Sequence, residues 1–91
     1  MLFAISYDIE KDRTRTRLAN TLKDFGQRVQ KSVFEADLDS DELEQLCKKL
    51  AAVELGKGDS IRLYQICGDC AKKVRIWGKG KVTKDQDFYI A

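Results

Sequence analysis

The 91-residue sequence predicts an α+β domain in which an antiparallel sheet carries two helices on one face. Short apolar or alternating segments, typical of strands, flank two stretches with the spacing of amphipathic helices. The order of these segments is strand, helix, strand, strand, helix, strand and then a tail. The length suits one domain, with residues 1–78 as its body and residues 79–91 as the tail.

The first strand and the first helix are the clearest elements. Residues 2–8 are almost wholly apolar and predict a buried strand. Residues 12–25 follow as an amphipathic helix, with Asp12 as its expected N-cap and Gly26 just beyond its C-terminus. The expected apolar face of this helix consists of Leu18, Leu22 and Phe25.

The middle of the chain alternates between strand and helix signals. Residues 27–38 show the two-residue period of half-buried strands, with a tight turn or a kink between two short strands expected at residues 31–32. Ser40 is the expected N-cap of a second helix over residues 41–55, and residues 60–66 form the next strand. The expected apolar stripe of the second helix consists of Leu43, Leu46, Cys47, Leu50 and Val53.

This order of elements is that of the ferredoxin-like arrangement, whose helices cover only one face of the sheet. Large uncovered apolar faces usually mark an interface, and a symmetric homodimer with the two sheets facing each other is the simplest closed solution. The apolar tail segment Phe88-Tyr89-Ile90 is expected to add a strand to the partner's sheet. The alternative is that the tail folds back on its own sheet.

Composition excludes several kinds of chemistry. The chain has no histidine, which rules out a Ser-His-Asp triad, a Cys-His dyad and any histidine-ligated metal site. An odd number of cysteines fits a reducing compartment, and without an apolar span or a leader we expect a cytoplasmic location. Cys67 and Cys70 have the spacing of a redox pair or half a zinc site, but with only Cys47 left to help, a structural turn is favoured.

Charge is distributed unevenly, with basic residues near both ends and acidic residues between positions 35 and 54. This pattern fits an anionic partner on one surface, with a solvated mixed surface as the alternative. A row of arginines on the first helix suits phosphate contacts, although Asp12 and Asp24 are alternative partners for it. The basic residues of this region that could make such contacts are Arg13, Arg17, Arg28 and Lys31.

Asp8 ends the first predicted strand, and a carboxylate at the mouth of a buried strand is expected to be paired, hydrogen-bonded or metal-bound. In a twofold dimer Asp8 would lie near its symmetry mate, and two nearby carboxylates favour a shared Mg²⁺ or Mn²⁺. The alternatives are a cap on the adjacent helix or an ion pair with an arginine of the same subunit. Tyr7 and Phe34 are expected in the core or an interface, and Ser32 is either a turn hydroxyl or a ligand near Asp8.

Four segments share a recognisable pattern. They are Tyr7-Asp8-Ile9, the Arg-rich stretch from Arg13 to Arg17, the stretch from Gly26 to Glu35, and Asp59-Ser60-Ile61-Arg62-Leu63-Tyr64 followed by Cys67. Together they resemble the CRISPR-associated endoribonuclease family Cas2, from residue 2 to about residue 78. The Gln-x-Ser-Val-Phe-Glu segment is the most specific part of this resemblance.

The resemblance implies a ferredoxin-like homodimer whose C-terminal strand packs on the partner's sheet. It also implies a metal-dependent phosphodiesterase acting on RNA or DNA, with Asp8 as catalytic residue and Mg²⁺ ligand. The family's first-helix arginines correspond to Arg13 and Arg17, its turn serine corresponds to Ser32, and Tyr7 and Ser32 are candidates to support Asp8. Members of the family act with the CRISPR integrase, Cas1, in capturing new spacers.

Two functional interpretations follow. The leading one is an Mg²⁺-dependent nuclease of CRISPR adaptation, in which Arg13, Arg17 and Arg28 hold the strand near Asp8. The alternative is a non-catalytic duplex-DNA-binding adaptor that bridges integrase dimers and does not need Asp8. A regulatory module for a small ligand is disfavoured by the arginine row and by the absence of a Gly-rich phosphate loop.

Overall fold

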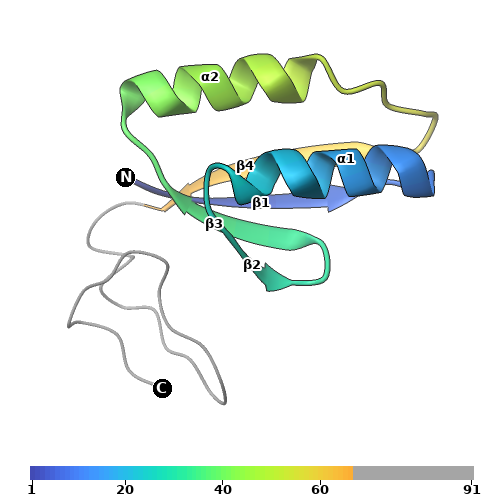
Figure 1. Ribbon diagram of the computed structural model, residues 1–91, viewed down its shortest axis with the longest axis horizontal. Helices are drawn as coiled ribbons and strands as arrows, with labels where there is room; N and C mark the ends of the chain where they lie inside the picture. Colours follow the sequence, from blue (N-terminus) through green and yellow to red (C-terminus); the bar gives the residue numbers. More distant parts are fainter. Residues whose placement is uncertain (67–91) are drawn as a thin grey trace.

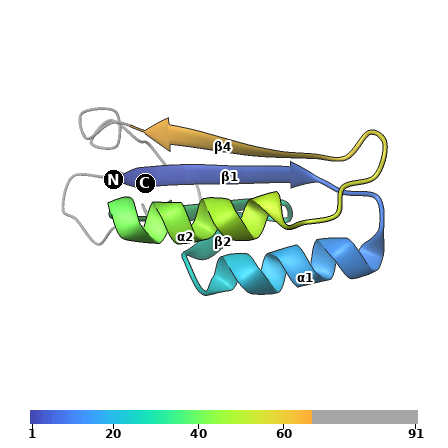
Figure 2. The same cartoon turned by 90° about the horizontal axis from the view of Figure 1, so that it is seen from above.

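The computed structural model describes residues 1–66 and has two layers, a four-stranded sheet and two helices that cover one of its faces (Figure 1; Figure 2). The elements are β1 Leu2–Asp8, α1 Asp12–Lys23, β2 Gln27–Gln30, β3 Val33–Asp37, α2 Ser40–Ala51 and β4 Ser60–Ile66. The strands lie in the order β2-β3-β1-β4, and every neighbouring pair is antiparallel. This is the ferredoxin-like arrangement, so the predicted α+β class and element order are confirmed.

β1 is a central strand, paired with β3 on one side and with β4 along its whole length on the other. Because side chains alternate across a strand, this placement sends Phe3, Ile5 and Tyr7 into the core. The other residues of β1, which end with Asp8, lie on the opposite face of the sheet, which we call the open face. No helix among residues 1–66 covers the open face (Figure 1).

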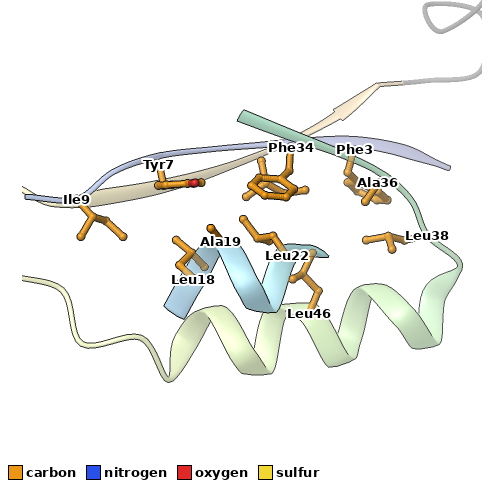
Figure 3. Packing of buried hydrophobic residues seen from close by; sticks show 11 residues of the cluster. Phe3, Tyr7, Ile9, Leu18, Ala19, Leu22, Phe34, Ala36, Leu38 and Leu46 are labelled. Carbon is orange, nitrogen blue, oxygen red and sulfur yellow. The ribbon is translucent and has the colours of Figure 1, made fainter. Parts of the chain in front are cut away.

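The core fills the space between the sheet and the two helices. Figure 3 shows Tyr7, Phe34 and Phe3 on the side of the sheet that faces the helices, with Leu18 and Leu22 of α1 and Leu46 of α2 on the other side of the core. Full burial of an aliphatic or aromatic side chain of this size contributes about 1.5–3 kcal/mol. Tyr7 and Phe34 are therefore core residues of the subunit, in agreement with the first of the two roles expected from the sequence. Their rings lie 6.3 Å apart.

α1 begins at residue 12, as the predicted range has it, but its N-cap and its C-terminal end differ from the prediction. The N-cap is Lys11, and Asp12 is the first helical residue, where its carboxylate pairs with Arg15 instead of capping the helix. The helix ends at Lys23, because the N–H groups of Asp24 and Phe25 bond to carbonyls three residues back and so tighten the last turn.

α2 begins one residue earlier than predicted and ends at Ala51 rather than at residue 55. Its N-cap is Asp39, not Ser40. The Asp39 carboxylate accepts from the backbone N–H of Glu42 at 2.8 Å, and the Glu42 carboxylate accepts from the backbone N–H of Asp39 at 3.0 Å. This reciprocal capping box satisfies two N–H groups that would otherwise lack partners, which fixes the start of the helix.

Cys47 was expected on the core face of α2, and this expectation is wrong, because the residue is exposed. Leu43, Leu46 and Leu50 form the stripe that faces the core. A residue next to Leu46 is turned about 100° around the helix axis, which carries Cys47 off that stripe. Cys67, Cys70 and the predicted strand of residues 79–91 lie outside the described residues.

Gly26, which follows α1, allows the chain to pass close to β3. A Cβ at this position would lie 2.0 Å from the carbonyl oxygen of Glu35 and 2.8 Å from the Cα of Ala36. These are backbone atoms of a paired strand, so they cannot move aside as a flexible side chain could.

We therefore expect Gly26→Ala to lower the free energy of unfolding by about 1–3 kcal/mol or more, the usual cost of overpacking. Urea denaturation at pH 7 measures this change. Gly58→Ala is the matched control, because a Cβ there would meet nothing within 4 Å and its cost arises only from the positive φ of 95°. A Gly26→Ala variant as stable as the wild type would contradict the close approach.

Candidate functional site

Asp8 is the last residue of β1 and lies on the open face of the sheet, opposite Ser60 of β4. Its side chain is exposed, so the carboxylate does not need a partner to offset the cost of burial, contrary to the expectation from the sequence. Within residues 1–66 the Asp8 carboxylate has neither a hydrogen bond nor an ion pair. The two structural alternatives, a helix cap and an ion pair with an arginine of the same subunit, are therefore absent from the described part of the chain.

A hollow of about 610 Å³ opens beside Asp8, between the end of β1, one side of α1 and the β2–β3 turn. We call it the Asp8 hollow. Among the lining residues within 1–66, Asp8 is the only acidic side chain, whereas four side chains carry positive charge. These four are Arg15, Lys23, Arg28 and Lys31. The excess of positive charge makes the Asp8 hollow suited to anions.

The β2–β3 turn is fixed against β1 next to Asp8. The backbone N–H of Tyr7 donates to the carbonyl of Ser32 at 3.1 Å, and the Tyr7 hydroxyl donates to the carbonyl of Lys31 at 3.4 Å. Arg28 lies over the ring of Phe34, with its guanidinium carbon 5.3 Å from the ring centre. Both predicted cations on this side, Arg28 and Lys31, therefore line the Asp8 hollow together with Ser32.

The first-helix arginines are divided between different surfaces. Arg17 lines a separate groove of about 390 Å³ between α1 and the end of α2, together with Lys49, and Arg13 is exposed and lines neither hollow. Arg15 and Lys23 face the Asp8 hollow instead. Arg15 and Lys23 each lie four residues from Ala19, and residues four apart share one face of a helix. This spacing could have identified both residues from the sequence.

The short connection between β1 and α1 is held from two sides. The Arg15 guanidinium donates to the carbonyls of Ile9 at 2.9 Å and Glu10 at 3.3 Å. On the other side, Asp59 accepts from the backbone N–H of Glu10 at 3.1 Å and from that of Gly56 at 2.9 Å. The hydrogen bond from Gly56, followed by that from Glu10, lowers the pKa of Asp59 below its ordinary value of 3.8.

The residues present set limits on a metal site. Residues 1–66 contain no group of three or more acidic or cysteine side chains that could enclose an ion. Mg²⁺, however, is usually held by one or two carboxylates and completes its shell with waters and substrate phosphates. One exposed carboxylate in an anion-attracting hollow fits an open site of this kind, with Asp8 as the ligand.

The fold and the site define a small ferredoxin-like protein with an exposed carboxylate beside a hollow whose charged lining residues are mostly cationic. The family model for CRISPR associated protein Cas2 matches residues 1–74, and the chain belongs to this family. Among residues 1–66, neither helix is long and apolar enough to cross a membrane.

Individual relatives agree with this assignment. The chain is 40% identical to a protein named CRISPR-associated endoribonuclease Cas2 1 from Chloroflexus aurantiacus, over 99% of both chains. The crystal structure of Streptococcus pyogenes Cas2 at pH 6.5 has a TM-score of 0.72 at 29% identity and covers 86% of this chain and 100% of that one. A chain of a partial Cas6-RT-Cas1–Cas2 complex has a TM-score of 0.69 at 31% identity, over 80% of this chain and 86% of that one.

The lowered pKa of Asp59 predicts a pH-dependent contribution to stability. A carboxyl whose pKa is lower in the folded state stabilises the fold fully above its unfolded pKa, and this contribution is lost as the pH falls through the folded pKa. We expect Asp59→Asn to lower the free energy of unfolding at pH 7, and the difference from the wild type to shrink once the pH falls below 3.8.

Urea denaturation at pH 7, 5 and 3 measures this difference. Glu54→Gln is the control, since Glu54 is exposed, lines the same hollow as Asp59 and can lose its charge without breaking either loop hydrogen bond. An Asp59→Asn deficit that is equally large at pH 7 and pH 3 would show that the ionised carboxylate is not the stabilising form.

Proposed function

We propose that the chain is an Mg²⁺-dependent phosphodiesterase of CRISPR adaptation. It would cleave RNA or DNA with Asp8 as the catalytic residue and metal ligand. The observation that carries this proposal is an exposed carboxylate, without a partner in residues 1–66, on the rim of a hollow that four cationic side chains line. The family membership and the names of the relatives support the same class of reaction.

Charge assigns different tasks to the residues of the Asp8 hollow. Arg28 of β2 and Lys31 of the β2–β3 turn would bind phosphate oxygens, Arg28 in the bidentate manner of guanidinium groups. Lys23 faces the hollow from α1, so the phosphate backbone would lie between the helix and the turn. Contacts of this kind fix the strand in place and do not select its sequence.

Asp8 would hold the metal, with Mn²⁺ as an alternative to Mg²⁺. When bound, the ion supplies charge stabilisation at the phosphoryl oxygens and activates the attacking water. The four surrounding cations oppose the approach of a bare divalent ion, but they attract phosphate. A phosphate bound in the hollow would offset this repulsion, so we expect the ion to bind weakly to the protein alone and more tightly beside the nucleic acid.

A homodimer would complete the site. Ala4 and Ser6 give the open face of β1 small, partly exposed side chains, and Tyr64 of β4 is half exposed on the same face. Pairing two such faces would bury them and would bring a second Asp8 near the first. The additional strand expected from residues 79–91 on the partner's sheet remains a prediction.

A second candidate function is supported by different features. The groove that contains Arg17 and Lys49 lies apart from Asp8, and one structural neighbour is part of a Cas1–Cas2 complex. A duplex-DNA-binding adaptor that bridges Cas1 integrase dimers would use such a basic surface and would not need Asp8.

Asp8→Ala separates the two functions. We expect Mg²⁺-dependent cleavage to fall by about a hundredfold or more, since a metal supplies several kcal/mol of charge stabilisation and each 1.4 kcal/mol is tenfold in rate. Binding should be retained, because the cations of the Asp8 hollow are untouched. Cleavage of labelled RNA, single-stranded DNA and duplex DNA is measured beside binding at several Mg²⁺ concentrations.

Asp41→Asn is the control for this experiment, because Asp41 is an exposed acid on α2 that lies outside the Asp8 hollow. Cleavage by Asp8→Ala at the wild-type rate would reject the nuclease assignment. Retained DNA binding without any cleavage by the wild type would favour the adaptor.

Arg28→Ala and Lys31→Ala test the phosphate contacts. Each lost contact should lower the slope of log affinity against log salt by about 0.7–0.9, because fewer counterions are released on binding. Fluorescence anisotropy at several salt concentrations would resolve this change. A range of roughly 50 mM to 200 mM salt is wide enough to measure such slopes. Lys48→Ala on the exposed side of α2, where Lys48 pairs with Glu44 at 3.6 Å, should leave the slope unchanged. Equal slopes for all three variants would exclude the β2–β3 turn from the binding surface.

A further inference from the structure

We propose that Asp59 is a positioning residue for Asp8, which fixes the backbone directly after β1 so that the Asp8 carboxylate keeps the orientation needed to hold a divalent cation. The inference rests on the proposed function of Asp8. It adds a residue that does not touch the substrate and that acts through the connection between β1 and α1.

The first support is the place of Asp59 in the fold. It directly precedes β4, whose first residue, Ser60, lies opposite Asp8 in the sheet. The end of β1, the start of α1 and the connection from α2 to β4 lie at the same end of the molecule (Figure 1; Figure 2). Asp59 is therefore beside the end of β1, although it is far from it in the sequence.

The second support is the pair of hydrogen bonds that Asp59 accepts. One carboxylate oxygen accepts from the backbone N–H of Glu10 at 3.1 Å, and the other accepts from the backbone N–H of Gly56 at 2.9 Å. A single side chain thus ties the residue two positions after Asp8 to the loop that leads into β4. Hydrogen bonds from backbone N–H groups to a charged carboxylate are stronger than those between neutral groups.

The third support is that the connection has little freedom left. Arg15 holds the carbonyls of Ile9 and Glu10 from the opposite side, and the Ile9 side chain is buried in the core. Residues 9–11 alone join β1 to α1. A displacement of Glu10 would therefore also move the backbone at Asp8, because so short and restrained a connection cannot change conformation to accommodate it.

Asp59 differs from Arg15 in what else it contacts. Arg15 lines the Asp8 hollow, so its substitution would change the charge that the substrate meets. Asp59 lines a different hollow of about 480 Å³, on the side of Glu10, Glu54 and Gly56. A change at Asp59 therefore alters the support of Asp8 and removes no positive charge from the Asp8 hollow.

The test compares Asp59→Asn with the wild type in the full chain. The carboxamide accepts through one atom only, so at least one of the two backbone hydrogen bonds is lost. We expect the affinity for Mn²⁺, measured by calorimetry, to fall severalfold, which is less than the loss of about tenfold to a hundredfold usual when a group hydrogen-bonded directly to a metal ligand is removed. The kcat for a labelled oligonucleotide should fall in parallel with an unchanged KM, and the Glu10 amide should exchange faster by NMR.

Glu54→Gln is the matched control, since it removes one negative charge from the same hollow without touching Glu10. We expect its Mn²⁺ affinity, kcat and Glu10 exchange to match those of the wild type. A variant Asp59→Asn with faster Glu10 exchange but wild-type Mn²⁺ affinity and kcat would overturn the inference and leave the role of Asp8 intact. Wild-type Mn²⁺ binding by Asp8→Ala would instead overturn the proposed function itself.

A measurement on the wild type keeps the inference testable if Asp59→Asn does not fold. Coupling between two sites is reciprocal, so a bond that orients Asp8 for the ion must itself be stabilised when the ion binds. Saturating Mg²⁺ should slow the exchange of the Glu10 amide several-fold at constant pH. Exchange at the same rate with and without Mg²⁺ would overturn the inference.

Discussion

The central position of β1 is the constraint on which the rest of the structure depends. Because β3 and β4 pair with it on both sides, β1 cannot rotate, and its alternation assigns each side chain to one face. Ile5 and Tyr7 are thereby buried beneath the helices, and Asp8 emerges on the open face where the strand ends. A shift of one residue would bury the carboxylate and expose the aromatic ring, so the same packing that stabilises the core also presents the acid.

The electrostatics of the site follow from this geometry. A carboxylate on the open face avoids the cost of burial, and the β2–β3 turn and α1 surround it with positive charge. The excess of positive charge in the hollow beside this carboxylate suits an anion such as phosphate. Hydrogen bonds to Arg15 and Asp59 hold the three-residue connection that follows Asp8 and joins β1 to α1.

Local chemistry explains where sequence-based prediction was inaccurate. Ser40 is a good N-cap by residue type, but Asp39 with Glu42 forms a reciprocal pair of hydrogen bonds, and the pair outweighs a single hydroxyl. Cys47 has the hydrophobicity of a core residue, yet Leu46 beside it occupies the core-facing position of the helix. The first-helix arginines were treated as one row, whereas the turn of the helix divides Arg15 from Arg17.

The sequence by itself determined the order of the elements, the buried face of β1 and the candidacy of Asp8, because alternation, helical spacing and short motifs are local properties of the chain. Only the tertiary structure decided that Asp8 is exposed, that Arg28 and Lys31 share its hollow with Arg15 and Lys23, and that Asp59 bonds to the loop after it. These facts depend on which segments the sheet and helices bring together. Residues 10 and 59 are neighbours only because β1 and β4 pair, and no local pattern encodes that contact.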